Sequence, residues 1–268
     1  CLMHGMEVAY YKKLFQTIGN IIELIEKDDI PKYLLFLENA FPYMDNYNYH
    51  KGMNGIIQEL TGLLKTKNIG TDSDRALLLD FQATLEIKPE KAIKLEKDAL
   101  AQIENITADN ARLVSNLHAN LGGLYRMNGH PDLAREHMEK SISLLDQFNL
   151  LHINDSIPQI ANYAMFLTEQ QEPERGISEL QKLSGIIKEY HSDDCLDYAK
   201  VQETLGTIYL MTANLPQAKT HFKRAFKIYE KIWADEPEMI KAKYQEIQEL
   251  YPQIGFCIEK NLSGLLTK

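Results

Sequence analysis

The sequence lacks a long hydrophobic run and has few cysteines. No apolar stretch approaches the ~18 residues that a membrane-spanning helix needs. Its three cysteines, Cys1, Cys195 and Cys257, are widely scattered, which excludes a disulfide framework and a clustered zinc site. We therefore expect a protein with no membrane partner, located in the reducing cytoplasm.

The sequence also lacks the short motifs of known catalytic and nucleotide-binding sites. There is no glycine-rich phosphate loop, no His-Glu-x-x-His and no Gly-x-Ser-x-Gly. The residues nearest to a metal-binding cluster are His191, Asp193, Asp194 and Cys195, and we expect acidic residues in this loop to cap the following helix. We therefore expect no enzyme activity, no cofactor and no metal ion.

Charge argues against nucleic acid as a partner. The net charge is −9, from 29 basic and 38 acidic side chains. Nonspecific binding to nucleic acid depends on neutralising phosphates with Lys and Arg. We expect no nucleic-acid partner.

What the sequence does contain is a repeat. Pro89, Pro131 and Pro173 lie 42 residues apart, and Pro216 lies one position beyond the next step. A small residue follows each proline by two or three positions: Ala92, Ala134, Gly176 and Ala218. A period of this length is typical of stacked supersecondary units. Small residues are needed where two packed helices approach closely.

The repeat resembles the tetratricopeptide repeat. The copy that contains Leu205, Gly206, Tyr209, Ala218, Phe222 and Ala225 matches all six positions of that family's pattern. The copy that begins at Leu121 matches four, with Met138 and Ser141 at the Phe and second Ala positions. The usual period is about 34 residues, and the longer period here is similar to the kinesin-light-chain type. The resemblance covers residues 73–233.

This resemblance implies an all-α, right-handed superhelical solenoid of antiparallel helix pairs. We expect divergent N-terminal hairpins over residues 1–70, regular repeats over 71–235, and C-terminal capping helices over 236–268. Apolar periodicity and helix-breaking residues predict helices over 6–27, 31–41, 49–65, 74–86, 89–104, 109–127, 131–148, 156–170, 173–190, 195–212, 215–233, 237–251 and 253–266.

The family's register places part of each first helix on a concave, partner-binding groove. The positions expected to face it are Asn116, Asn120, Gly123, Met127, Asn162, Met165, Lys200, Thr204 and Thr207. An asparagine amide both donates and accepts, so Asn120 and Asn162 are suited to hold the backbone of an extended peptide. Alternatively, these asparagines bridge neighbouring helices within the stack.

A protein or an extended peptide is therefore the expected partner. The chain does not begin with methionine, so we expect a piece of a longer, bacterial protein. Similar arrays form the sensor or interaction arm of signalling NTPases, which implies a nucleotide-binding or other domain N-terminal to the array. The alternatives are a peptide-pheromone receptor domain of a transcriptional regulator and, more remotely, an enzyme on an all-helical scaffold.

Overall fold

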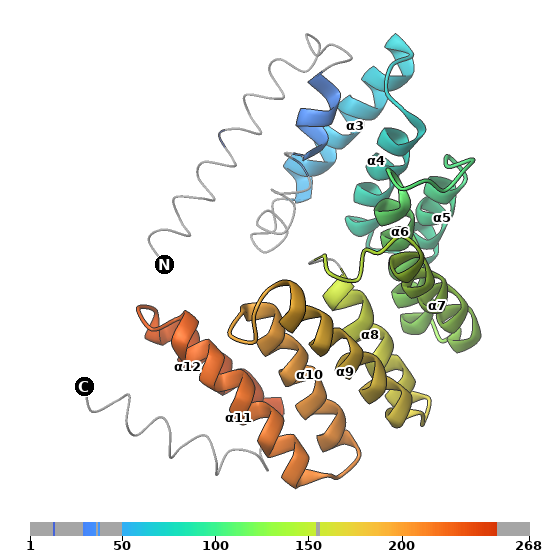
Figure 1. Ribbon diagram of the computed structural model, residues 1–268. Coiled ribbons are helices and arrows are strands. Elements are labelled where there is room, and N and C mark those ends of the chain that lie inside the picture. Colours follow the sequence, from blue (N-terminus) through green and yellow to red (C-terminus); the bar gives the residue numbers. More distant parts are fainter. Residues whose placement is uncertain (1–12, 14–28, 36, 38–49, 154–155, 251–268) are drawn as a thin grey trace. The chain divides into compact units, whose positions relative to one another are not determined.

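The computed structural model describes residues 13, 29–35, 37, 50–153 and 156–250, and every regular element in these ranges is helical (Figure 1). Residues 30–35 are also helical. The longer helices are α3 (His50–Lys67), α4 (Asp72–Thr84), α5 (Pro89–Leu100), α6 (Ala111–Met127), α7 (Pro131–Gln147), α8 (Ser156–Glu169), α9 (Pro173–Tyr190), α10 (Leu196–Met211), α11 (Leu215–Ile232) and α12 (Pro237–Leu250). None of these helices combines the length and apolar character needed to cross a membrane.

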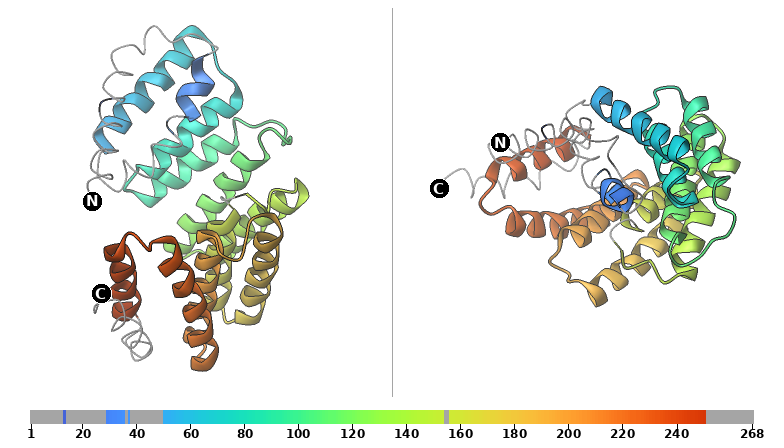
Figure 2. Two further views of the ribbon diagram at one scale, coloured as in Figure 1. Left: turned by 60° about the vertical axis from the view of Figure 1, so that its left-hand side comes forward. Right: turned by 90° about the horizontal axis from the view of Figure 1, so that it is seen from above.

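The chain divides into two compact units, Cys1–Leu144 and Leu145–Lys268. In the first unit α4 packs against α5, and in the second α8 pairs with α9 and α10 with α11. Figure 2 shows these pairs as hairpins whose helices run antiparallel. This is an all-α repeat of helix pairs, so the predicted fold class is confirmed.

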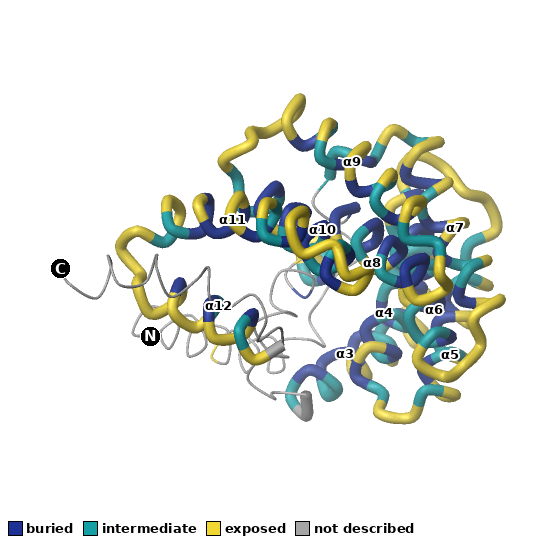
Figure 3. Tube along the Cα trace, turned by 90° about the horizontal axis from the view of Figure 1, so that it is seen from below, coloured by how far each residue is buried: buried dark blue, intermediate teal, exposed yellow. Residues whose placement is uncertain are grey.

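Each helix of a pair buries one stripe of its surface. In α11 the buried residues are Ala218, Phe222, Ala225, Phe226, Ile228 and Tyr229. Their helical spacing places them on one face, and Figure 3 shows buried and exposed segments alternating along this helix. Burial of this face against α10 stabilises the pair through removal of apolar surface from water.

The turn inside each pair explains the proline spacing. Gly129, Gln171 and Ala213 lie 42 residues apart and all have positive φ, +75°, +64° and +58°. Each ends its helix in a Schellman motif, in which the following N–H donates to the carbonyl five residues back, at 2.9, 2.8 and 2.7 Å. Pro131 and Pro173 then open the next helix. In the third copy Leu215 opens α11, which places Pro216 one position later.

The small residues lie at the close approach between paired helices. A Cβ added at Gly206 would come within 2.9 Å of the Phe222 ring, and one at Gly122 within 2.5 Å of Met138. At Gly176 it would meet the carbonyl oxygen of Ala164 at 2.6 Å. These contacts leave no room for a larger side chain at the three positions.

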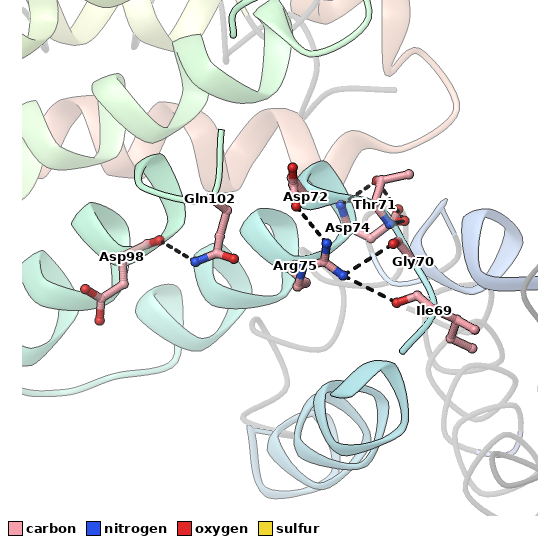
Figure 4. A network of polar contacts seen from close by, with 8 residues as sticks. All are labelled: Ile69, Gly70, Thr71, Asp72, Asp74, Arg75, Asp98 and Gln102. Atoms are coloured by element: carbon pink, nitrogen blue, oxygen red, sulfur yellow. Dashed lines mark hydrogen bonds and ion pairs between the residues drawn. The ribbon is translucent and has the colours of Figure 1, made fainter. Parts of the chain in front are cut away.

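The start of α4 shows how local polar contacts set a helix boundary (Figure 4). Thr71 accepts from the Asp74 amide at 3.1 Å while the Asp74 carboxylate accepts from the Thr71 amide at 2.6 Å, forming a capping box. Arg75 pairs with Asp72 at 2.7 Å and donates to the carbonyls of residues 69 and 70. The connection between α3 and α4 is therefore held by the first turn of α4.

The predicted helices from residue 49 to 251 agree with the described ones, with one correction. The helix predicted over 89–104 ends at Leu100, because Gln102 and Ile103 donate to Ala99 and Leu100 in tight turns. Ile103 then packs against the cluster of Ala76, Ala99 and Leu117. The helix predicted over 253–266, that over 6–27 except residue 13, and part of 31–41 fall outside the described residues.

Two glycines of α9 provide a matched test of the close approach. We expect Gly176→Ala to destabilise the protein by about 1–3 kcal/mol, because the added methyl group meets backbone. Gly185→Ala, on the same helix but with nothing within 4 Å of an added Cβ, should stabilise it by about 0.5–1 kcal/mol. Thermal and urea unfolding of both variants measure the two effects. Equal effects would show that the α8–α9 approach is not as tight as described.

Candidate partner-binding groove

A groove of about 320 Å³ lies in the second unit, along α10. Lys200 and Thr204 from α10, two of the residues expected to face a partner, are among its lining residues. The other lining residues are Leu196 and Glu203 from α10, Tyr229 from α11, Trp233 at the C-cap of α11, and Lys243 from α12. Three successive helices therefore contribute to one concave surface.

Glu203 is the polar centre of the groove. Its carboxylate accepts from the Tyr229 hydroxyl at 2.6 Å and forms an ion pair with Lys243 at 2.8 Å. Burial, together with the charge of Glu203, raises the pKa of Tyr229 well above its usual range, so the phenol stays a donor. Burial acts to lower the pKa of Lys243, but contacts with Glu203 and Glu246 outweigh it and raise that pKa. The charge of Glu203 is therefore balanced by Lys243, and both side chains are held in place.

Aromatic side chains form an apolar wall. Trp233, the only tryptophan of the chain, stacks on Tyr229 with ring centroids 4.8 Å apart. On the neighbouring side of α11, Phe226 stacks on Tyr244 of α12 at 4.2 Å. Stacked rings of this kind hold each other's orientation and contribute about 0.5–1.5 kcal/mol beyond burial. The Trp233 ring is therefore positioned before any partner arrives.

Lys200 and Thr204, the two predicted lining residues, differ in how their polar groups are already engaged. Lys200 is exposed and lies 3.6 Å from Asp197, a surface pair of small energetic weight. The Thr204 hydroxyl donates to the carbonyl of Lys200 at 3.0 Å, so its oxygen is left to accept from a partner. Thr207, one turn further on, donates in the same way to Glu203 at 3.1 Å and does not line the groove.

The other predicted residues fall in two separate sets. On α8 in the second unit, Asn162 is exposed and Met165 is half-buried. On α6 in the first unit, Asn116 is half-buried, Gly123 faces open space and Met127 is 81% exposed. Each set is accessible on its own helix. The partner-binding role of all these residues stays a prediction.

Asn120 bridges helices, as the alternative interpretation expected. Its amide nitrogen donates to the Asp80 carboxylate on α4 at 2.8 Å. This bond links the first helices of two successive repeats, and it occupies one of the two donors of the amide. Asn120 therefore contributes to packing of the stack as well as being exposed on its surface.

A second cavity, of about 330 Å³, lies in the first unit. Its lining residues are Thr61, Leu64, Lys65, Asn68, Arg75, Leu78, Leu79 and Gln102. Leu78 lies three repeat steps of 42 residues before Thr204, so one register position lines a cavity in each unit. Figure 4 shows Arg75 of this cavity engaged with the α3–α4 connection.

The cluster considered for a metal site is dispersed into separate contacts. His191 bonds to the carbonyl of His152 at 3.0 Å, Asp193 lies 3.8 Å from Lys188, and Asp194 pairs with Lys231. The Cys195 sulfur accepts from the Tyr198 amide and caps α10. Among the described residues no group of three metal-ligating side chains comes together.

Sequence reasoning missed five groove residues: Leu196, Glu203, Tyr229, Trp233 and Lys243. Family register predicts positions on first helices, whereas Tyr229 and Trp233 lie at the end of a second helix. Lys243 lies in α12, where the sequence departs from the repeat. The one available signal was the occurrence of the single tryptophan at the end of α11.

Comparison with known proteins agrees with the helical-repeat fold. Residues 156–231 match the tetratricopeptide repeat family model, so this part of the chain consists of tetratricopeptide repeats. No curated protein matches the chain. Several solved structures are similar in fold, two of them at a TM-score of about 0.55.

One is a crystal structure of a Podosopora anserina putative kinesin light chain with nearly identical TPR-like repeats. It is 14% identical, covering 75% of this chain and 98% of that one, with a TM-score of 0.55. The other is BtubC (BKLC) from P. vanneervenii, 16% identical, covering 89% of this chain and 92% of that one, with a TM-score of 0.56. At these identities the likeness concerns the fold alone, and it supports the predicted kinesin-light-chain-like repeat.

We expect Tyr229→Phe to destabilise the second unit by about 1.5–3 kcal/mol, because a buried bond to a carboxylate is lost. The change in Trp233 fluorescence during urea unfolding reports this unit directly. As a control, Tyr190→Phe removes the hydroxyl of an exposed tyrosine and should change stability by no more than about 0.5 kcal/mol. Equal midpoints for the Tyr229 variant and the wild type would contradict the described network.

The two asparagines should respond differently to truncation. Asn120→Ala removes the bond to Asp80 and should cost about 1–3 kcal/mol of stability. Asn162→Ala changes an exposed position and should cost no more than about 0.5 kcal/mol. Calorimetric melts of the two single variants compare them. A larger cost at Asn162 than at Asn120 would reverse the assignment of the structural asparagine.

Proposed function

We propose that this tetratricopeptide repeat scaffold binds an extended peptide segment of another protein in the groove along α10. The observation that carries the proposal is the coincidence of two predicted positions, Lys200 and Thr204, with a groove walled by Trp233 and Tyr229. Tryptophan and tyrosine are enriched at protein interfaces, because they combine apolar area with a polar group.

The lining chemistry suits a peptide better than a small apolar ligand. Leu196, Trp233 and Tyr229 offer apolar contact, while Thr204 and the Glu203–Lys243 pair offer hydrogen-bonding groups beside it. An extended peptide presents backbone donors and acceptors together with alternate side chains, and so uses both kinds of surface. Half-buried Glu203 is already neutralised, so the groove does not select strongly by charge.

Lys200, at the rim of the groove, favours peptides with an acidic group at that end. Its ammonium group is exposed and only loosely paired with Asp197. We therefore favour a segment with an aliphatic or aromatic side chain against Trp233 and an acidic group near Lys200. A rim charge of this kind affects the association rate and its salt dependence more than the final affinity.

We also propose a role for the scaffold within a larger protein. Tetratricopeptide repeats generally serve as interaction scaffolds, which favours a role as the sensor or interaction arm of a larger, signalling NTPase-like protein in the cytoplasm. The alternative is the peptide-sensing domain of a transcriptional regulator. Sequencing of the full gene separates them, since a nucleotide-binding domain supports the first and a helix-turn-helix domain the second.

Binding in the groove is tested with a matched pair of threonines. Thr204 and Thr220 each donate to the carbonyl four residues earlier at 3.0 Å, but Thr220 lies exposed on α11 outside the groove. Peptides selected from a displayed random library by the wild-type chain serve as probes. Thr204→Arg should weaken their binding about tenfold or more, which is a loss of about 1.4 kcal/mol, while Thr220→Arg should leave it unchanged.

Trp233 provides the readout. A peptide seated against the indole should change its fluorescence, and the titration gives the dissociation constant for each variant. Circular dichroism melts confirm that both variants remain folded. If the selected peptides bind the Thr204→Arg variant as tightly as the wild type, the α10 groove is not the binding site.

A further inference from the structure

One repeat replaces its central packing contact with two acids. Asp80 occupies the repeat position held by Gly122 and Gly206, and Glu96 the position held by Met138 and Phe222. In those two pairs the glycine packs directly against the large side chain, and the remaining pair, α8–α9, has Ala164 and Leu180 at the same positions. Between α4 and α5 the same contact is made by two carboxyl groups. Both helices remain regular there, with Glu96 buried and Asp80 half-buried.

Glu96 is enclosed almost completely. Its side chain is 1% exposed, it hydrogen-bonds to Asp80, and its Oε2 has no hydrogen-bond partner in the described structure. Asn120 of α6 closes the cluster by donating to the Asp80 carboxylate at 2.8 Å. Ionisation of both adjacent carboxyl groups is unfavourable, because burial desolvates Glu96 and its charge would be repelled by that of half-buried Asp80.

We propose that Asp80 and Glu96 form a buried proton-binding site that holds one shared proton at neutral pH, and that close packing of α4 on α5 depends on this proton. The proton lets one carboxyl group donate to the other, as in paired acids that titrate as a unit. The unprotonated pair would place uncompensated charge in the contact that a small residue and an apolar side chain make in the other repeats.

The surroundings of Glu96 favour its protonated form, and the nearby basic side chains have other partners. Burial, followed by the charge of Asp80 and the hydrogen bond with it, raises the pKa of Glu96 to about 10, against a smaller opposing effect of Asn120. On α6, His118 is turned to His137 of α7, with the two Nδ1 atoms 2.9 Å apart. On α5, the ammonium of Lys97 lies 5.8 Å from the centre of the Tyr125 ring.

The direction of the pH effect follows from linkage. Glu96 has a higher pKa in the folded state than its ordinary value of 4.5. Its contribution is therefore complete below pH 4.5 and is lost as pH rises toward about 10. In this window the opening equilibrium of α4–α5 should rise about tenfold per pH unit. His118, whose pKa burial lowers to about 4, is neutral in both states above pH 7 and adds no slope there.

Hydrogen exchange with mass spectrometry tests the site in the intact chain. Opening constants of peptides from α4 and α5 are measured between pH 7 and 9, after correction for intrinsic exchange, with peptides from α9 as an internal reference. The wild type should show the tenfold slope in α4–α5 only. Glu96→Gln, which keeps the shape and donates a hydrogen bond without a titrating group, should show none.

A second variant covers the case in which Glu96→Gln does not fold. The double change Asp80→Gly with Glu96→Phe recreates the Gly206–Phe222 contact and should fold with no pH slope. A flat wild-type profile, or the same slope in either variant, would overturn the proposal. So would protection of wild-type α4–α5 by millimolar calcium at pH 9 that Glu96→Gln lacks, since the pair would then bind a cation.

Discussion

Close contact at a glycine determines the helix separation in the pairs α6–α7, α8–α9 and α10–α11. Gly206 lies against Phe222, Gly122 against Met138, and Gly176 against the backbone of Ala164. At these distances a single added methyl group has no space, so the helix separation is set by the small residue. The buried stripes and the Schellman turns follow from that separation, because both must fit a pair of closely spaced antiparallel helices.

Regular spacing made most of the fold predictable. Proline and the small residue two or three positions later mark the start of every second helix, and the observed boundaries agree to within about two residues for all but one. The exception, α5, ends early because Ile103 folds back onto Ala99 and Leu117, a tertiary contact that helix propensity does not contain.

Only part of the groove lining was predictable from the sequence, because several lining side chains come from other helices through tertiary packing. Register predicts first-helix positions such as Thr204, but Trp233 and Lys243 reach the same groove from α11 and α12. The partner of Asn120 was also missed. Asp80 stood at a position reserved for glycine or alanine, and this departure from the pattern was itself the signal of a buried polar contact.

The turns between paired helices also bear on how such an array can change over time. Gly129 adopts its left-handed conformation freely, whereas Gln171 and Ala213 do so at a cost of about 1–2 kcal/mol each. These residues are exposed and lie outside the groove. Stability can therefore be raised or lowered, one repeat at a time, by exchange at a turn, while the surface that meets a partner diversifies independently. Stability gained at a turn can then offset the destabilisation caused by substitutions in the groove.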